Sequence, residues 1–204
     1  KLAPHRVMAP SGTYPLWIQK FAGKQADGRD FVTHFNTQGG QGAFHDRDGV
    51  SAVVFPGNIA STSVELFEHE TPMLVRRRAL IPDSGGPGRF RGGLGQETVL
   101  EARARTPVHA ALSGGRFHQP ASGMDGGAPG ALGEIRVNDE PPFARPDRVD
   151  LLPGDRVTLR QPGGGGFGPA QDRDPAHLAA DLRDGYITAE GAVRDYHVAL
   201  APAR

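Results

Sequence analysis

The sequence contains no cysteine among its 204 residues, which excludes disulfides, thiolate zinc sites, iron–sulfur clusters and a cysteine nucleophile. It has no net charge, because 23 basic side chains balance 23 acidic ones, and this balance is not typical of nucleic-acid-binding proteins. Long apolar runs are missing as well. The run at 52–55 is far too short to span a membrane, and 1–11 holds no apolar core of a signal peptide. We therefore expect a cytoplasmic protein that binds neither nucleic acid nor membranes.

Glycine and proline are abundant, whereas aromatic residues are few. The chain has 29 glycines and 18 prolines but only 7% aromatic residues, and the share of glycine plus proline is about twice the usual one. Short apolar clusters predict strands. They lie at 30–35, 50–55, 63–66, 73–80, 97–102, 108–112, 134–137 and 157–159. We predict an α+β fold that is mainly β, with a short-stranded sandwich or barrel-like body and glycine-rich loops.

Residues 170–204 have a different, helical character. Asp174 followed by Pro175 is typical of a helix start, since aspartate caps free N–H groups and proline fits the first turn. Gly185 is a natural helix end, and Thr188 begins a second helix that runs to Val198. We predict a β-rich domain over 1–169 and a helical hairpin over 170–204 that packs on this body or on a partner. Five side chains are expected to make its apolar contacts: Leu178, Leu182, Ile187, Val193 and Tyr196.

The densest glycine-rich segment, 83–97, permits two interpretations. Its backbone N–H groups could cradle an anion, with Arg89 or Arg91 supplying positive charge. The segment is not a P-loop, because no Gly-Lys-Ser/Thr follows, and no helix follows as a dinucleotide site requires. The alternative is a chain of tight turns that need positive φ. The run 163–166 also permits two interpretations: it is either a flexible linker or a place where another backbone comes very close.

Side chains that could bind a metal or take part in catalysis are scattered along the sequence rather than gathered in one motif. Asp46, Asp48 and Gly49 are similar to part of a calcium loop, but the third carboxylate and the closing glutamate are absent. The eight histidines show no metal-binding spacing, and no serine lies in Gly-x-Ser-x-Gly. If 64–70 is a strand, Glu68 is either a buried carboxylate and a site candidate or part of a solvated edge. We expect no metal site in this chain.

The order of the motifs along the chain is more informative than any one of them. The series is Gly39, Gly40 and Gly42, then Asp48-Gly49, Val64-Glu65 and Glu68, then DSGGPGRFRGG at 83–93, PGGGGFG at 162–168, and Arg173-Asp174-Pro175 with Asp181. This series resembles the C-terminal part of the hydantoinase B/oxoprolinase family. Members include N-methylhydantoinase and 5-oxoprolinase B-type chains, with relatives among the large subunits of acetone and acetophenone carboxylases. The resemblance covers nearly the whole chain, whereas B-type subunits of the family are much longer.

The resemblance implies a C-terminal segment or split subunit of an ATP-dependent cyclic-amide hydrolase that is inactive alone. It implies a hetero-oligomer with an ATP-binding A-type subunit and an N-terminal B-type chain or segment. ATP and Mg²⁺ would bind the A-type subunit and a divalent metal the N-terminal part, with no cofactor on this chain. As catalytic groups we single out Glu65, Glu68 and Arg91. The loops expected to shape the substrate channel or the face toward the A-type subunit contain Gly39, Gly40, Gly42, Asp83, Ser84, Gly85 and Gly86.

The sequence leaves two alternatives open. One is a subunit of an ATP-dependent acetone/acetophenone-type carboxylase, which the family resemblance does not separate from the hydrolases. The other is a non-catalytic assembly or scaffold subunit. The scaffold alternative predicts that the complex forms and turns over normally when Glu65 or Glu68 is changed to glutamine.

Overall fold

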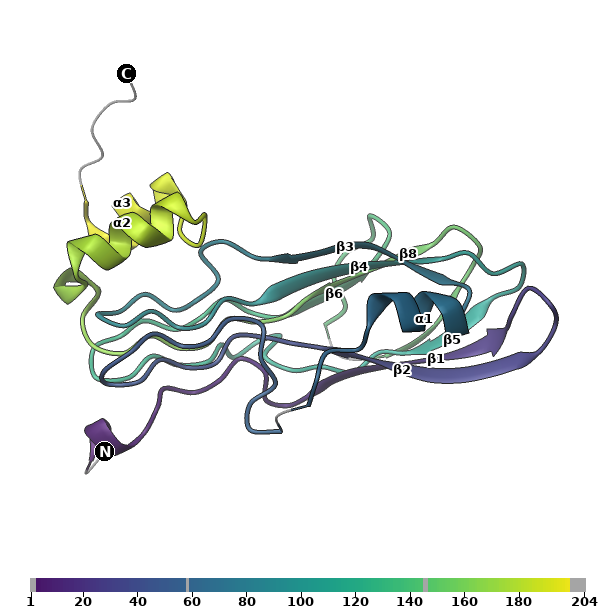
Figure 1. The fold of residues 1–204 in the computed structure, drawn as a ribbon, viewed down its shortest axis with the longest axis horizontal. Helices are drawn as coiled ribbons and strands as arrows, with labels where there is room; N and C mark the ends of the chain where they lie inside the picture. Colours follow the sequence, from purple (N-terminus) through teal and green to yellow (C-terminus); the bar gives the residue numbers. More distant parts are fainter. Residues whose placement is uncertain (1–2, 58, 145–146, 199–204) are drawn as a thin grey trace, which may run out of the picture.

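The computed structural model describes residues 3–57, 59–144 and 147–198 and shows two four-stranded antiparallel sheets packed face to face (Figure 1). The first sheet has the order β2 (Asp30–Thr37), β1 (Trp17–Lys24), β5 (Val108–Ala111) and β7 (Arg148–Leu151). The second has the order β3 (Met73–Leu80), β4 (Gln96–Ala102), β8 (Arg156–Arg160) and β6 (Glu134–Val137). The two sheets do not close into a barrel, so the predicted mainly-β fold is confirmed in its sandwich form.

Alternating side chains on the facing strands make the core between the sheets. In β1, Trp17 and Phe21 are fully buried, while Lys20 is exposed. In β8, Val157 and Leu159 point inward in the same way. Successive strand residues point to opposite faces, so each sheet removes one face from water and keeps the other polar. Apolar residues buried by this packing stabilise the sandwich.

Six predicted strands lie where the sequence places them, and two strands are missed. The confirmed ones are β2, β3, β4, β5, β6 and β8. The pattern misses β1 because its core position Gln19 is polar. The Gln19 amide donates to the Ser113 carbonyl at 2.8 Å and accepts the Ser113 N–H at 2.9 Å, which satisfies it in the interior. β7 is missed because it has only four residues.

The predicted strand at 50–55 is wrong. Val53 makes a single isolated bridge with Gly39, and Ala52 has a φ of 49° that interrupts an extended run. The Val50 carbonyl accepts the Gln41 N–H at 2.9 Å. The segment therefore belongs to the glycine-rich region rather than to either sheet.

The predicted strand at 63–66 is also wrong, because helix α1 (Val64–Glu70) begins there. The Ser63 side chain accepts the Leu66 N–H at 3.2 Å, which caps the first turn. Phe67 is buried, with ring centroids 4.6 Å from Phe35 and 5.8 Å from Phe21. Aromatic packing therefore fixes the helix against the sandwich, where it lies between β2 and β3 (Figure 1).

Beyond the sheets, the chain forms a glycine bundle of extended segments without named strands (Figure 1, left). We define the glycine bundle as residues 9–13, 39–43, 49–53, 84–95, 121–131 and 161–168. Backbone hydrogen bonds connect these segments laterally: the N–H of Gly86 donates to Gly164, that of Gly164 to Gly93, and that of Gly93 to Gln41, at 2.8–2.9 Å. The bundle is therefore held together mainly through its main chain.

Glycine is required in the bundle by close approach of backbones. A Cβ on Gly163 would lie 1.7 Å from the Ser84 carbonyl oxygen, and one on Gly40 would lie 1.8 Å from that of Gly93. Within 83–95 the residue with positive φ is Asp83, not a glycine, so the interpretation as glycine turns of positive φ is wrong. The run 163–166 is entirely buried. Of its two interpretations, close backbone approach is confirmed and the flexible linker is wrong.

The C-terminal helical hairpin is confirmed for the residues that the structure describes, up to 198. Short 3₁₀ turns precede the body (Pro4–Arg6) and the hairpin (Ala170–Asp172). α2 (Pro175–Arg183) begins after Asp174, whose carboxylate accepts the Ala176 N–H at 2.7 Å. α3 (Ala189–Tyr196) begins after Thr188. The outer ends of the two predicted domains, 1–2 and 199–204, lie outside the described residues.

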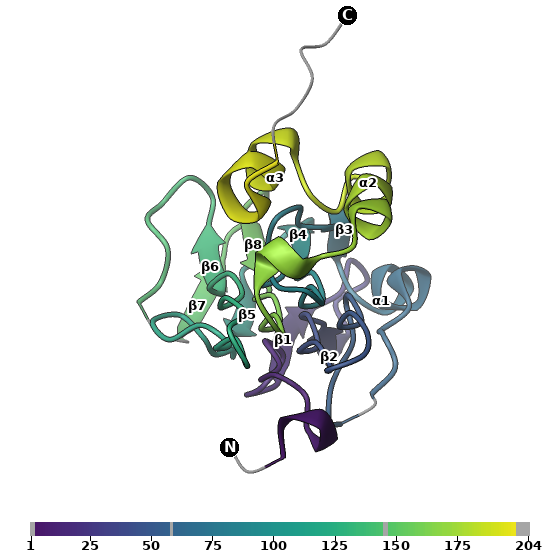
Figure 2. The same cartoon turned by 90° about the vertical axis from the view of Figure 1, so that its left-hand side faces the viewer.

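The hairpin packs on the body of its own chain, at the end formed by the glycine bundle (Figures 1 and 2). Asp83 makes one of the contacts, because its carboxylate accepts the N–H of Thr188 at 2.8 Å and the hydroxyl of Thr188 at 2.6 Å. Leu178, Ile187 and Tyr196 form an apolar cluster together with Ala192, and Leu182 packs against it. Val193 was expected there, but its side chain is exposed. None of the helices in the described ranges has the length and apolar character that crossing a bilayer requires.

Glu101, on the outer face of β4, gives the fold a predicted acid sensitivity. Hydrogen bonds from Arg76 and Arg156 lower the pKa of Glu101 from 4.5 to about 2. A lowered folded-state pKa stabilises the protein above the unfolded value, and this contribution is lost as the pH falls toward the folded value. We expect the stability difference between wild type and Glu101→Gln to be constant above about pH 5 and to close between pH 4.5 and 2.

Urea unfolding at a series of pH values measures this difference. The control is Glu140→Gln, which removes an exposed glutamate and should leave stability unchanged across the same range. A gap between wild type and Glu101→Gln that persists at pH 2 would contradict the prediction.

Candidate functional site

The structure does not bring the three singled-out catalytic residues together. Glu65 and Glu68 lie on α1 beside the sandwich, whereas Arg91 donates to Asp181 of α2. Figure 1 shows α1 and α2 far apart along the molecule. The exposed carboxyl of Glu65 has a lowered pKa, because it accepts hydrogen bonds from the backbone N–H of Glu65 and from the Ser63 hydroxyl. Glu68 accepts the N–H of Val75 at 2.8 Å. Both carboxylates have local structural partners, and their catalytic role stays a prediction.

The predicted loop residues meet inside or at the edge of the glycine bundle. The N–H groups of Gly40 and Gly86 donate to carbonyls of the bundle at 2.9 and 2.8 Å, so these two groups are not available to cradle an anion. The Ser84 hydroxyl donates to the Ile81 carbonyl and accepts the Gly95 N–H at 2.9 Å. These residues therefore build the support on which the hairpin rests.

Two arginines and two aspartates from distant parts of the chain meet where the hairpin contacts the bundle, and we call Asp48, Arg91, Arg173 and Asp181 the charged junction. The Arg173 guanidinium donates to both oxygens of Asp48, at 2.9 and 2.8 Å, and to Asp181 at 2.5 Å. The Arg91 guanidinium lies 3.3 and 3.4 Å from the same Asp181 carboxylate. The backbone N–H of Arg91 donates to Asp48 at 2.7 Å. One carboxylate of α2 is thus shared by two arginines.

Three of the four side chains of the charged junction are nearly closed to water, whereas Asp48 is 29% exposed. The side chains of Arg173, Arg91 and Asp181 are 1%, 5% and 8% exposed. Burial opposes ionisation of Asp48, yet hydrogen bonds and charge from Arg173 hold the Asp48 pKa below its usual value. Burial also opposes ionisation of Arg173, but Asp48 and Asp181 outweigh it and raise its pKa. Two cations cancel two anions, so the junction offers no free base or nucleophile and serves to hold the hairpin.

Two tyrosines cover the arginines of the junction. The Arg173 guanidinium lies 6.0 Å from the ring of Tyr196, and that of Arg91 lies 5.4 Å from the ring of Tyr186. Burial raises the pKa of Tyr196 to about 12. The phenol therefore stays neutral at physiological pH, and its ring shields the ion pairs from water.

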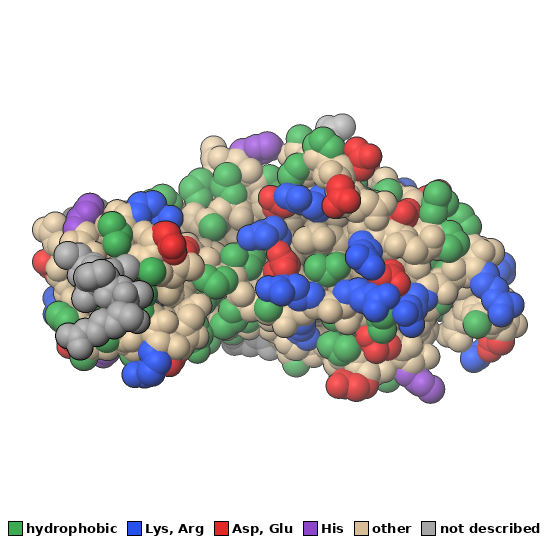
Figure 3. Space-filling view, turned by 90° about the horizontal axis from the view of Figure 1, so that it is seen from above, with side chains coloured by type: hydrophobic (Ala, Val, Ile, Leu, Met, Phe, Trp, Pro, Cys, Tyr) green, Lys and Arg blue, Asp and Glu red, His purple; other side chains and the backbone are tan. Residues whose placement is uncertain are grey.

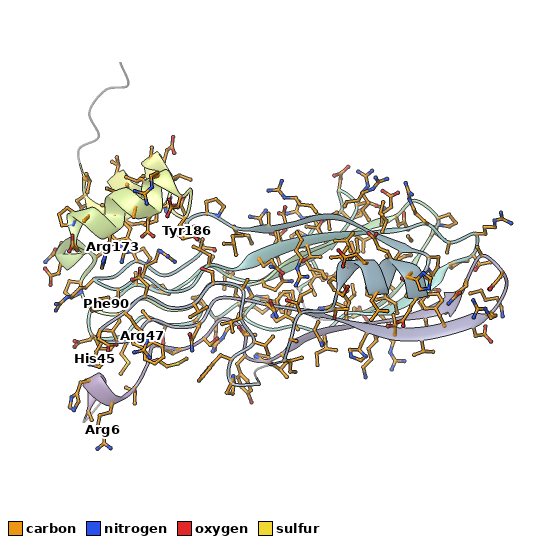
Figure 4. All side chains as sticks on the ribbon, in the orientation of Figure 1. Arg6, His45, Arg47, Phe90, Arg173 and Tyr186 are labelled. Carbon is orange, nitrogen blue, oxygen red and sulfur yellow. The ribbon has the colours of Figure 1, made fainter. Side chains whose placement is uncertain are left out.

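A shallow pocket of about 270 Å³ opens beside the junction, at the end of the molecule where Figure 4 shows Arg47, Phe90 and Arg173. Its lining is Asp46, Arg47, Asp48, Phe90, Arg173, His177, Ala180 and Asp181. A second hollow, of about 630 Å³, shares Phe90, Arg173 and His177 with it. Acidic and basic groups mix in this lining, which suits a polar chain segment or a small zwitterion better than a strongly charged ion.

A metal centre does not form in the part of the chain that the structure describes. No three His, Asp or Glu side chains gather there closely enough to hold an ion. The divalent metal that the sequence resemblance implies was expected on an N-terminal part outside this chain, and it stays a prediction.

Sequence reasoning singles out Arg91 but not its partners as site residues. Asp48 is 43 residues from Arg91 and Asp181 is 90 residues from it, so no local spacing connects them. A signal was nevertheless present, because Asp48, Arg173 and Asp181 all belong to the motif series that carries the family resemblance.

A sequence model of the hydantoinase B/oxoprolinase family matches residues 1–170. Among curated relatives, the chain is 33% identical over 153 residues to caprolactamase subunit beta of Pseudomonas jessenii, covering 71% of this chain and 26% of the relative. The chain spans only about a quarter to a third of the first curated relatives that it matches.

Two solved structures share the fold over 98% of this chain. One is the crystal structure of the ATP-dependent caprolactamase from Pseudomonas jessenii, with a TM-score of 0.86, 27% identity and 37% of that chain covered. The other is a nucleotide-free acetone carboxylase described as ATP-dependent, with a TM-score of 0.82, 21% identity and 32% of that chain covered. The second likeness, at this low identity, concerns the fold alone.

Proposed function

The chain belongs to the hydantoinase B/oxoprolinase family, and on that premise we propose that it is the C-terminal part of the B component of an ATP-dependent cyclic-amide hydrolase. One observation carries the proposal: the likeness to caprolactamase holds both in sequence, at 33% identity, and in fold, over 98% of the chain. The carboxylase likeness is limited to the fold. The hydrolase is therefore favoured over the carboxylase.

The proposed reaction explains why ATP and a second component are needed. An amide carbonyl is a poor electrophile because resonance delocalises the nitrogen lone pair onto oxygen. An A-type subunit that transfers a phosphoryl group from ATP to the lactam oxygen would remove this stabilisation. Water could then attack the carbonyl carbon, and breaking of the C–N bond would open the ring to an amine and an acyl phosphate. A second water would hydrolyse the acyl phosphate to the carboxylate and inorganic phosphate. A metal on the N-terminal part of the B component would supply the nucleophile.

The contribution that we propose for this chain is positioning rather than bond breaking. Its glycine bundle presents a rigid end, and the charged junction fixes the hairpin on it with all four charges paired. The loops at Gly39–Gly42 and Asp83–Gly86 would then shape the channel or the face toward the A-type subunit. This arrangement needs the rest of the hetero-oligomer for turnover, in keeping with the expected lack of activity of the chain alone.

An assay of the complete complex tests the function. The complex of this chain, the remaining B-type part and the A-type subunit is incubated with 5-oxoproline, hydantoin or caprolactam, each with and without ATP. We expect ring-opened product and ADP only when ATP is present and only with the complete complex. Mass spectrometry of the product and coupled detection of ADP measure the two outcomes.

Two results would contradict the proposal. Incorporation of labelled bicarbonate into acetone or acetophenone, without ring opening of any lactam, would establish the carboxylase instead. Full turnover by a complex that lacks this chain would exclude a role in the reaction. Separately, full turnover by complexes that carry Glu65→Gln or Glu68→Gln would show that these two residues are not catalytic.

A further inference from the structure

The outer face of the second sheet carries a concentration of basic side chains (Figure 3), and the basic residues of its strands are all arginine. We call this surface the arginine face and define it by six residues: Arg76, Arg77, Arg103, Arg136, Arg156 and Arg160. The core-facing positions of the same strands are apolar, including Leu100 on β4 and Leu159 on β8. A β-bulge between Val75 and Arg77 turns two successive arginines of β3 to the outside.

Three glutamates lie among these six arginines. Glu101 accepts two hydrogen bonds from Arg76 at 2.8 Å and one from Arg156 at 3.0 Å, and Arg103 lies 3.5 Å away. Glu97 pairs with Arg77 and Arg160 at 2.8 Å, and Glu134 pairs with Arg136 at 2.7 Å.

The ion pairs hold the guanidinium groups in place but leave most of their N–H donors available. Each guanidinium has five N–H donors, and the glutamates use only one or two donors of each arginine. The side chains of Arg77, Arg103 and Arg156 remain 57–61% exposed. The face therefore presents ordered donors to an incoming partner, whose binding would cost little side-chain entropy.

The surface is positively charged although the whole chain is neutral. Six cations against three anions leave a surplus of three positive charges on one sheet face, whereas the chain has 23 charges of each sign. The surplus is therefore a local asymmetry. Such an asymmetry attracts a partner of opposite charge and orients it on approach.

We propose that the arginine face docks a protein surface that carries an excess of aspartate and glutamate. Half-buried apolar residues lie between the charged ones, among them Leu74, Ala79 and Val99. Arginine is enriched at protein–protein interfaces relative to the rest of the protein surface. A nucleic-acid backbone fits less well, because its continuous phosphates would meet the three fixed glutamates.

Charge reversal in the assembled complex tests the docking. This experiment rests on the proposed function for its partner, the A-type subunit together with the remaining B-type part. The variant is Arg77→Glu with Arg160→Glu. The control is Arg29→Glu with Arg183→Glu, which reverses two exposed arginines that also pair with carboxylates, but away from the arginine face.

We expect the arginine-face variant to associate about tenfold more weakly at low salt, and the difference from wild type to shrink as ionic strength rises. The control should associate like wild type. The milder variant Arg77→Gln with Arg160→Gln should give an intermediate loss, and thermal unfolding of every variant identifies effects that come from misfolding. Arginine footprinting with phenylglyoxal should show protection of the face in the wild-type complex.

Other results would overturn the inference. Unchanged association of both arginine-face variants, with unprotected arginines in a complex that forms, would exclude the face as an interface. Self-association of the chain through this face, or salt-dependent binding of a 20-base-pair DNA duplex that the reversal abolishes, would assign it a different occupant. Failure of the wild-type complex to form would instead contradict the proposed function.

Discussion

Gly163→Ala is expected to destabilise the fold severely. The new Cβ would lie 1.7 Å from the carbonyl oxygen of Ser84 and 2.4 Å from its carbonyl carbon. The contact is with backbone, which cannot rotate away as a flexible side chain does. Overpacking typically costs about 1–3 kcal/mol, and for this site we expect the upper end or more. Expression level and urea unfolding measure the effect.

Gly57→Ala is the matched control for this substitution. The nearest atoms to a Cβ at this position belong to side chains of Val54 and Ile59, at 3.4 and 3.6 Å, and its φ is not in the left-handed region. The same chemical change should therefore alter stability by less than about 0.5 kcal/mol. If Gly163→Ala unfolds at the same urea concentration as Gly57→Ala, the bundle is not packed as described.

Removing the carboxylate that two arginines share is expected to release the hairpin. In Asp181→Ala, Arg91 loses its ion pair and Arg173 keeps only Asp48, so a buried positive charge is left without compensation. Breaking a buried pair from one side typically costs about 3–5 kcal/mol. Urea unfolding gives the total loss, and hydrogen exchange should show α2 and α3 opening before the sandwich.

Asp184→Ala is the control, because it removes a more exposed aspartate that pairs with Arg183 at 3.0 Å on the same helical hairpin. Surface pairs of this kind contribute about 0–1 kcal/mol. Equal losses for Asp181→Ala and Asp184→Ala would show that the charged junction does not hold the hairpin.

Elements with local signals could be predicted from the sequence. The hairpin follows from Asp174-Pro175, Gly185 and Thr188, because capping and helix ends depend on neighbouring residues. Most strands follow from apolar alternation. The segment 64–70 is an exception. Its spacing of Glu65 and Phe67 would place both side chains on one face of a strand, but the Ser63 cap and the burial of Phe67 stabilise a helix instead.

Non-local features could not be predicted in the same way. A glycine that needs positive φ and a glycine that touches another backbone look alike in sequence, so the bundle is visible only in three dimensions. Likewise, Arg91 could be singled out by its place in a glycine-rich motif, but its connection to Asp48 and Asp181 depends on the fold. Glu65 and Glu68 share a motif series with Arg91, yet the fold places them on α1, whereas Arg91 contacts α2.

The glycine bundle also has a consequence for how stability changes with temperature. Exposure of apolar surface raises the heat capacity on unfolding, whereas exposure of polar surface lowers it. Glycine segments such as 163–166 bury peptide groups and almost no hydrocarbon. The bundle therefore adds little to the heat-capacity change that the sandwich generates. Per residue, this protein should show a flatter stability curve than a domain of equal length with a conventional side-chain core, and so tolerate cooling better.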